Sequence, residues 1–210
     1  MKRRASAPPD LSRYGVLAEY NRKRRFGVTP EPPGRPGRRR AAGVAFVIQK
    51  HRASHLHYDF RLEHEGAMLS WAVPKGPSPD PSVKRLAMMT EPHPMDYNGF
   101  EGVIPEGEYG GGTVMVWDQG TYEPDVPDVT KALRAGELPF HLRGKKLRGG
   151  WVLIRTRGRQ WLLIKRKDAL ASKSVDVTAT KPRSVVSRRL LAGIARDGGG
   201  DVAKAATGDP

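Results

Sequence analysis

Between residues 44 and 168 the chain alternates short apolar stretches with turn residues. Each stretch has the length of a β-strand, and several alternate apolar and polar positions with a period of two. The dipeptides Glu65-Gly66 and Arg157-Gly158 are typical of hairpin turns between such strands. The pattern predicts strands at 44–49, 56–64, 67–73, 85–90, 113–118, 138–143, 151–156 and 161–166.

Helical periodicity is limited to two short segments. Residues 129–135 predict a helix with Thr130 as its N-cap and Gly136 directly after its end. Residues 11–25 carry apolar positions at helical spacing but include Gly15, so the helix expected there is short. About eight short strands with one or two flanking helices predict a mainly β protein, a compact barrel or sandwich rather than a doubly wound sheet.

The sequence divides into three regions of different composition. Residues 1–43 form a basic arm, rich in Pro, Gly and Arg, that we expect to be partly disordered and to cross the surface of the β domain. Residues 44–168 carry all the predicted strands and form that folded β domain. Residues 169–210 are rich in Ala, Ser, Gly and Lys, and we expect a disordered tail there.

The net charge of +15 is concentrated before the predicted strands. Residues 1–50 hold 13 Lys and Arg against 3 Asp and Glu, whereas residues 51–168 hold 17 against 15. Clusters such as RKRR and GRRR bind phosphate backbones with little sequence preference, because binding releases counterions. A solvated tail or contact with an anionic membrane is the alternative explanation of the same charge.

The composition also limits the kind of metal site and the compartment. There is no cysteine, so any metal must be held by His, Asp, Glu or water. The chain has no run of eighteen apolar residues and no apolar stretch behind its basic N-terminus, so we expect neither a membrane span nor a secretory signal. A cytoplasmic protein whose basic clusters bind nucleic acid fits these features.

Five of the six histidines lie between residues 51 and 93, and the densest group is HRASHLHYDFRLE, residues 51–63. In a strand, alternate side chains share a face. One face then carries Tyr58, Phe60 and Leu62, which can enter the core. The other face carries His57, Asp59, Arg61 and Glu63. We therefore expect a site on the outer surface of the barrel, outside any cavity, as suits a polymeric substrate.

The polar face of this strand has the chemistry of a metal and phosphate site. His57 and Asp59 are about 7 Å apart along a strand, so both can reach one ion. Arg61 can donate to the oxygens of a phosphate bound to that ion. Spacing alone does not decide whether His51 or His55 is the third ligand. Ordinary alternation in a half-buried strand is the competing explanation of the whole pattern.

Two segments after this strand carry further candidate groups. In residues 91–97, EPHPMDY, prolines flank His93 and fix the backbone near Tyr97, so that His93 can donate to a phosphoryl oxygen or protonate a leaving group. In residues 103–112 the glycines favour a hairpin turn or bulge over a phosphate-binding loop, although Glu106 and Glu108 remain candidate metal or supporting groups. The four tryptophans lie in apolar runs and are expected in the core: Trp71, Trp117, Trp151 and Trp161.

These motifs together resemble the 3′-phosphoesterase domain of bacterial DNA ligase D. HRASHLHYDFRLE is followed in order by LSWAVPKGPS, EPHPMDY and FEGVIPEGEYGGG, with YNRKRRFGVTPEP upstream and WLLIKRKD downstream, so that the resemblance covers about residues 16–168. It implies a small closed β-barrel and a manganese-dependent enzyme that trims 3′ ends of DNA during double-strand break repair by non-homologous end joining. The chain would be a stand-alone, monomeric form that meets a separate DNA ligase and an end-binding protein.

The resemblance also implies roles for individual residues. His51, His57 and Asp59 would hold the metal. Arg61, His93 and Tyr97 would bind the phosphate and act in catalysis, with Arg24 and Glu31 of the arm as further substrate-binding residues. The family has an Asp where this chain has Arg25. Removal of a 3′-terminal ribonucleoside is therefore less well supported than removal of a 3′-phosphate.

Two other functions fit part of the pattern. A non-haem iron oxygenase would use His57, Asp59 and His141 as ligands and Arg155 for an oxo-acid, but it leaves Arg61 and His93 without a role. A non-catalytic DNA-end-binding module of the same fold would have lost the metal and phosphate residues, which this chain retains.

Overall fold

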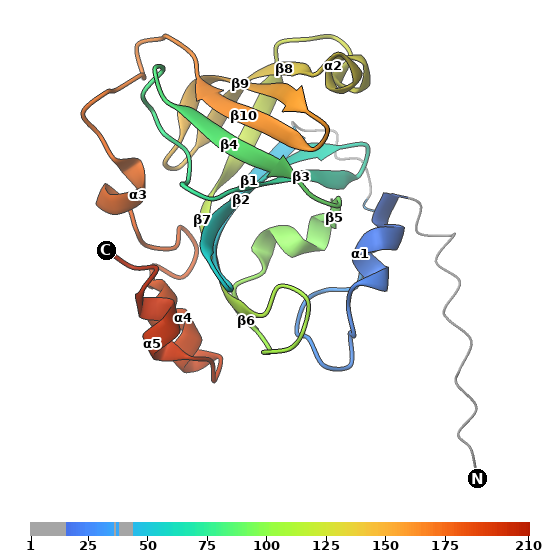
Figure 1. Ribbon diagram of the computed structural model, residues 1–210, viewed down its shortest axis with the longest axis vertical. Helices are drawn as coiled ribbons and strands as arrows, with labels where there is room; N and C mark the ends of the chain where they lie inside the picture. Colours follow the sequence, from blue (N-terminus) through green and yellow to red (C-terminus); the bar gives the residue numbers. More distant parts are fainter. Residues whose placement is uncertain (1–15, 36, 38–43) are drawn as a thin grey trace.

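A closed antiparallel barrel of eight strands forms the centre of the molecule (Figure 1). The computed structural model describes residues 16–35, 37 and 44–210. Neighbouring strands around the barrel are β1 (Val44–Arg52), β2 (Leu56–His64), β3 (Ala67–Val73), β4 (Lys84–Met89), β10 (Gln160–Lys165), β9 (Arg148–Arg157), β8 (Glu137–Gly144) and β7 (Gly112–Pro124), and β7 pairs back onto β1. The predicted β class and the barrel implied by the family resemblance are both confirmed.

The barrel interior is filled with side chains. Tyr58, Phe60 and Leu62 of β2 point inward, as the alternation predicted. The four tryptophans are also buried there, each at most 1% exposed. Burying a tryptophan removes roughly 200 Å² from water, a gain of about 5 kcal/mol before conformational entropy is subtracted. Because the interior is filled, a substrate must bind outside the barrel.

The predicted turns and the helix at 129–135 are present with one correction. Glu65 and Gly66 join β2 to β3 with φ of 50° and 79°, the left-handed conformation of a tight hairpin turn. Helix α2 (Val129–Ala135) ends at Gly136 in the left-handed conformation. Its N-cap is Asp128 rather than Thr130, because the Asp128 carboxylate accepts a hydrogen bond from the backbone N–H of Lys131 at 2.9 Å.

Short elements cover the outer face of β1, β2 and β3. They are α1 (Ala18–Arg22), β5 (His93–Pro94), which pairs with β3, the 3₁₀ helix η2 (Met95–Gly99) and β6 (Gly102–Ile104), which pairs with β7 (Figure 1). Helix α1 lies in the segment predicted to be helical; residues 1–15, 36 and 38–43 of the predicted arm lie outside the described residues. These outer elements form the wall opposite the polar side of β2.

The segment after Asp168 is folded, and the predicted disordered tail is wrong. It contains α3 (Val177–Thr180), α4 (Leu191–Asp197) and α5 (Val202–Ala206), with α4 and α5 packed against each other (Figure 1). Leu191, Ile194 and Ala195 are buried in the main core. A few apolar residues at helical spacing suffice here because the barrel supplies the surface that they cover.

A candidate metal and phosphate site

Two neighbouring strands bring three possible metal ligands together. His51 of β1 and His57 of β2 are direct partners across the antiparallel pair, and their ring centroids are 4.8 Å apart. The Asp59 carboxylate lies 3.6 Å from His51 Nδ1 and 3.7 Å from His57 Nε2. One ligand atom from each residue lies within 4.8 Å of the others. Two imidazoles and a carboxylate at this separation are a suitable donor set for a divalent transition metal.

The backbone orients both imidazoles toward Asp59. His51 Nε2 donates to the Gly110 carbonyl at 2.8 Å, and His57 Nδ1 donates to the His55 carbonyl at 3.1 Å. A carbonyl oxygen only accepts, so the ring nitrogen that faces it carries the hydrogen. The opposite nitrogens, His51 Nδ1 and His57 Nε2, are therefore left with lone pairs directed toward Asp59. Of the two candidates for the third position, the structure places His51 in the cluster, whereas the His55 ring is exposed.

Asp59 and Arg61 form a buried ion pair beside these imidazoles. Arg61 Nη2 donates to Asp59 Oδ2 at 3.1 Å, and Arg61 is only 2% exposed. Burial opposes ionisation of Asp59, but the neighbouring Arg61 charge acts against it, and the pKa of Asp59 is held below its usual range. Burial lowers the pKa of His57, so its imidazole is neutral and available as a ligand.

Two buried polar residues that the sequence did not single out hold Arg61 in place. Arg61 Nε donates to Gln49 Oε1 at 3.0 Å, and Arg61 Nη1 donates to Ser70 Oγ at 2.7 Å. Gln49 also donates from Nε2 to the carbonyls of Tyr97 and Phe100. In the sequence, Gln49 and Ser70 were distinguished only as polar residues within otherwise apolar strands. Arg61 has five N–H donors, and with three used by protein groups, two remain for a ligand.

His93 and Tyr97 line the other side of the same space. His93 Nδ1 donates to the Glu91 carbonyl at 2.9 Å, so His93 Nε2 accepts from Arg24 Nη2 at 3.2 Å. Burial, followed by the charges of Arg61 and Arg24, lowers the pKa of His93 well below its usual value. Tyr97 is 3% exposed, and burial raises the pKa of its phenol, which stays protonated. Its ring lies 5.2 Å from the Arg61 guanidinium.

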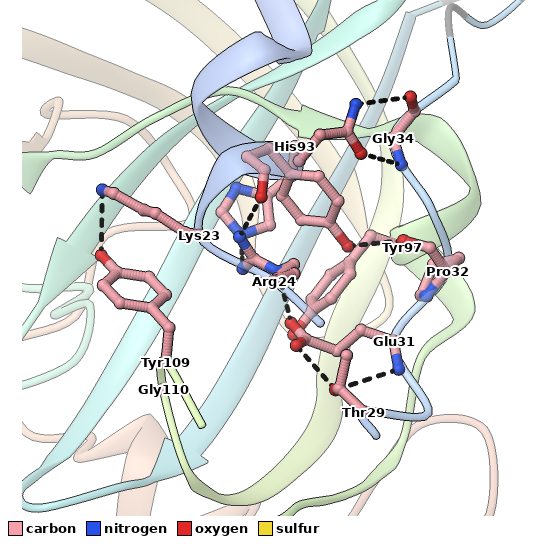
Figure 2. A network of polar contacts seen from close by, with 12 residues as sticks. Lys23, Arg24, Thr29, Glu31, Pro32, Gly34, His93, Tyr97, Tyr109 and Gly110 are labelled. Carbon is pink, nitrogen blue, oxygen red and sulfur yellow. Dashed lines mark hydrogen bonds and ion pairs between the residues drawn. The ribbon is translucent and has the colours of Figure 1, made fainter. Parts of the chain in front are cut away.

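The arm contributes Arg24 and Glu31 to this space (Figure 2). Arg24 Nε donates to Glu31 Oε1 at 2.9 Å, and the Arg24 guanidinium stacks on the Tyr20 ring at 3.7 Å. Thr29 Oγ1 donates to the second carboxylate oxygen of Glu31. Both side chains of the ion pair are at most 4% exposed, so Arg24 is fixed where it meets His93.

The neighbouring Arg25 points away from the site. Its side chain is 71% exposed and pairs with Glu108 in the loop between β6 and β7. Lys23 reaches the same loop through the Tyr109 hydroxyl (Figure 2). Its ammonium group also pairs with Glu91 at 3.0 Å. The loop is a hairpin connection, as predicted. Arm and loop are thus joined near Gly110, whose carbonyl orients His51.

These groups enclose a cavity of about 300 Å³ on the outside of the barrel. The site does lie on the outer face of β2, but the expectation that it lies outside any cavity is wrong. The arm, η2 and the β6–β7 loop build walls that the strand pattern did not reveal. The wall residues include Arg24, Glu31, His51, His57, Asp59, Arg61, Glu91, His93, Tyr97 and Tyr109.

The ligands required for an iron oxygenase are not brought together in the described part of the chain. His141 lies on β8, where its Nδ1 is 2.7 Å from Asp125, and it is not part of the metal-ligand cluster. Arg155 donates to the Arg134 carbonyl beside α2. Glu108, which the sequence offered as a further candidate metal ligand, pairs with Arg25 instead.

No helix of the described residues is long and apolar enough to cross a membrane.

Comparisons with known proteins find one matching family and several similar proteins. The sequence profile of the family described as "DNA Ligase D 3'-phosphoesterase domain" matches residues 49–155. A multifunctional non-homologous end joining protein LigD from Pseudomonas aeruginosa is 53% identical over 182 residues, which are 83% of this chain and 22% of that protein. A LigD from Mycobacterium tuberculosis is 46% identical over 146 residues, 70% of this chain and 19% of that protein. The chain spans about a fifth of the length of these curated relatives.

Proposed function

The chain belongs to the DNA ligase D 3′-phosphoesterase family, and from this membership and the site geometry we propose that it hydrolyses phosphate esters at the 3′ ends of DNA. The observation that carries the proposal is the orientation of His51 and His57. Their outer nitrogens are held by backbone carbonyls, and their inner nitrogens converge with Asp59 beside a buried arginine that has two N–H groups to spare.

His51, His57 and Asp59 would hold the ion. Neutral imidazoles and one carboxylate suit divalent transition metals, and manganese is the ion that the family resemblance implies. When bound, such an ion supplies positive charge for a phosphoryl oxygen and lowers the pKa of a coordinated water. Gly110 and His55 would fix the two imidazoles through their carbonyls, which is the supporting layer that metal-binding histidines require.

Arg61 and Tyr97 would bind the phosphate. The two remaining N–H groups of Arg61 can donate to phosphoryl oxygens, and the protonated phenol of Tyr97 can donate from the opposite wall. Both groups are fixed before the substrate arrives, Arg61 by Gln49 and Ser70 and Tyr97 by its burial. A preorganised positive site stabilises the charge that builds up on the phosphoryl oxygens during hydrolysis.

His93 would become a proton donor only once the substrate phosphate is bound. In the described arrangement its Nε2 accepts from Arg24, so it does not donate to a phosphate while it is neutral. A phosphate dianion placed between Arg61 and Arg24 would offset the two charges that help to lower the pKa of His93. His93 would then gain a proton on Nε2 and become able to donate it to the leaving oxygen.

Removal of a 3′-phosphate is the stronger part of the proposal. Arg24 and Glu31 are in the wall of the cavity, but Arg25 occupies the position of the family's Asp and is held outside by Glu108. We therefore propose a 3′-phosphatase whose removal of a 3′-terminal ribonucleoside is weak. The names of the relatives place the family in non-homologous end joining, and we propose the same context here, with DNA ends as substrate and a DNA ligase and an end-binding protein as partners.

The test is an end-processing assay with manganese on two primer–templates, one ending in a 3′-phosphate and one in a 3′-ribonucleotide. We expect a 3′-hydroxyl product from the first, little product from the second, and no product after chelation of the metal. Salt-sensitive binding of both DNAs without turnover under any of several divalent metals would support the non-catalytic DNA-binding module instead.

A further inference from the structure

Six cationic side chains line a second pocket that no part of the proposed reaction uses. The pocket has a volume of about 590 Å³, and no Asp or Glu of the described residues lines it. The six residues come from the turn between β8 and β9, from the first residue of β9 and from the segment between α3 and α4. We call them the cationic pocket: Lys145, Lys146, Arg148, Lys181, Arg183 and Arg188.

The charges of the cationic pocket are not neutralised within the described residues. None of the six forms a salt bridge there, whereas nearby Arg143 and Arg189 each pair with a carboxylate. Lys146 Nζ donates to the carbonyls of Lys181 and Arg183 at 2.7 and 2.6 Å. These acceptors carry no net charge, so the positive charge of the pocket persists and attracts an anion.

Burial and neighbouring positive charges disfavour the charged form of Lys146. Burial comes first, and the charges of Lys50 and Lys181 add to it; together they outweigh nearby Asp118 and lower the pKa of Lys146 to about 7. A protein gains no stability from such an arrangement by itself. Bound phosphate groups would relieve the repulsion between the lysines.

The backbone of the cationic pocket is fixed by hydrogen bonds to the barrel. Trp117 Nε1 donates to the Lys181 carbonyl at 2.9 Å, and the backbone N–H of Val185 donates to the Val116 carbonyl at 3.0 Å. Ser184 Oγ donates to Glu101 at 3.0 Å. The cationic side chains therefore project from an ordered backbone, which reduces the conformational entropy lost when a ligand binds.

The same hydrogen-bonded segment adjoins the wall of the candidate active site. Val185 packs in a small apolar cluster with Val47 and Val116 on the outer face of β1 and β7, and Met95 of η2 packs against that cluster. Helix η2 carries Tyr97, and Glu101, which holds Ser184, lies shortly after it. The cationic pocket and the metal site are thus on connected parts of the same outer surface.

We propose that the cationic pocket binds backbone phosphates of the DNA whose 3′ end occupies the active site; this inference rests on the proposed function for its substrate. A duplex presents about one negative charge per 1.7 Å of its axis, so a strand leaving the site offers phosphates to the neighbouring cationic pocket. Binding here is independent of base sequence. It adds affinity for long substrates and leaves the chemistry at the metal site unchanged.

The experiment measures the affinity of a 3′-phosphate primer–template by fluorescence anisotropy at several salt concentrations. The triple variant Arg148→Gln, Lys181→Gln and Arg183→Gln removes three exposed charges from the pocket. We expect roughly tenfold weaker binding near physiological salt and a shallower dependence of log K on log salt, by up to about 0.9 for each lost contact. The matched control, Lys131→Gln, Arg134→Gln and Arg157→Gln, removes three exposed charges elsewhere and should keep the wild-type affinity and slope.

A second measurement separates this inference from the proposed function. Val185, which also lines the cationic pocket, packs on Val47, four residues before His51 on β1, so the two sites are about 13 Å or more apart. A 3′-phosphorylated dinucleotide does not span that distance, so the triple variant should hydrolyse it at the wild-type rate. The double variant Arg148→Lys and Arg183→Lys keeps the positive charge at both positions and should bind the long substrate with wild-type affinity. Such binding would show that the loss in the glutamine variant comes from the missing charge and not from a disturbed fold.

Three outcomes would overturn the inference. The first is an equal loss of DNA affinity in the pocket variant and the control variant. The second is wild-type DNA affinity in the pocket variant. The third is displacement of DNA by poly-glutamate of equal charge at equal concentration, because an acidic protein would then be the better ligand. If wild type hydrolyses neither substrate, the proposed function fails while the binding result still decides whether the pocket holds DNA.

Discussion

His51 and His57 are direct partners across β1 and β2, and each has its far ring nitrogen bonded to a backbone carbonyl. Pairing in register places the two rings 4.8 Å apart, and the carbonyls of Gly110 and His55 set which nitrogen of each ring carries the hydrogen. The chelating geometry is therefore a property of the folded backbone, present before an ion arrives. An ion that binds such a site has little reorganisation free energy to overcome.

Replacing His57 by Ala should abolish metal binding and the metal-dependent activity. In wild type, manganese at about one hundred times its Kd should stabilise the folded protein by about 2.7 kcal/mol, seen as a rise in the thermal midpoint. The variant should show no such rise, and its phosphatase rate should fall by a factor of about 100 or more. His55→Ala is the matched control, because only its backbone carbonyl takes part. Full activity of the His57 variant, or equal losses in both variants, would contradict the assigned ligand set.

Gln49 should be a positioning residue for Arg61 and Tyr97. Its removal in Gln49→Ala leaves Arg61 Nε and the Tyr97 and Phe100 carbonyls without their partner, at a cost of about 1–3 kcal/mol for a buried group. We expect kcat to fall by about 10- to 100-fold, while manganese affinity measured by calorimetry stays at the wild-type value. Gln119→Ala, on β7 outside the site, should leave both quantities unchanged. A loss of metal affinity equal to the loss of kcat would indicate general unfolding instead.

Arg25 should limit the range of 3′ ends that the enzyme accepts. In Arg25→Asp a carboxylate replaces the guanidinium that pairs with Glu108, and the two acids repel each other. Because the Arg25 side chain is exposed, we expect the variant to fold. The expected result is more removal of a 3′-terminal ribonucleoside relative to removal of a 3′-phosphate, measured on the two primers side by side. An unchanged ratio of the two activities would show that this position does not select between the substrates.

Stability should fall as the pH drops through the range where histidines titrate. The pKa of His93 is lowered well below that of an unfolded histidine, which is about 6.5. As the pH drops below 6.5, the unfolded chain gains a proton that the folded chain does not, so the free energy of unfolding decreases. The slope is at most about 1.4 kcal/mol per pH unit for each such histidine, and His57 contributes with the same sign. Urea unfolding from about pH 5 to 7.5 should show a shallower slope in His93→Gln than in wild type; an identical slope would refute the role of this group.

Removing the C-terminal segment should destabilise the barrel. A chain ended after Asp168 loses Val177, Leu191, Ile194, Ala195 and Ala205, all of which are buried in the main core. Loss of one large aliphatic side chain from a core costs about 2–5 kcal/mol, so loss of the whole group should exceed the stability of a typical domain. Size-exclusion chromatography and circular dichroism should find this product aggregated or unfolded. A soluble product with the wild-type melting temperature would show that the helices are dispensable.

The sequence predicted the strands best where alternation was strict. Strand β2 begins and ends where expected, at Leu56 and His64, because its apolar and polar residues alternate without exception in the core-facing part. Strand β7 continues to Pro124, six residues beyond the expected end, because Gln119 and Gly120 broke the pattern while backbone pairing with β1 continued. Local sequence does not contain the hydrogen bonds that a neighbouring strand supplies.

The part of the candidate site that lies on strand β2 was predictable from the sequence. Parity placed His57, Asp59 and Arg61 together, whereas the choice of His51 over His55 came from the family resemblance. Its structural basis is the register of β1 against β2, which pairs His51 with His57. Gln49 and Ser70 were missed because their importance comes from contacts with Arg61 across separate strands. The cavity was missed for the same reason, since its walls come from the arm, η2 and the β6–β7 loop.

The three candidate metal ligands all lie on one hairpin, whereas the groups on the far side of the cavity come from the arm and from the segment around η2. The two halves of the site can therefore change independently in evolution. A duplicated copy that lost its arm would keep the hairpin, His93 and Tyr97, and would lose the wall that Arg24 and Glu31 supply. In the laboratory, the hairpin can be held constant while the arm is randomised, which makes the arm the natural place to select for new kinds of damaged DNA ends.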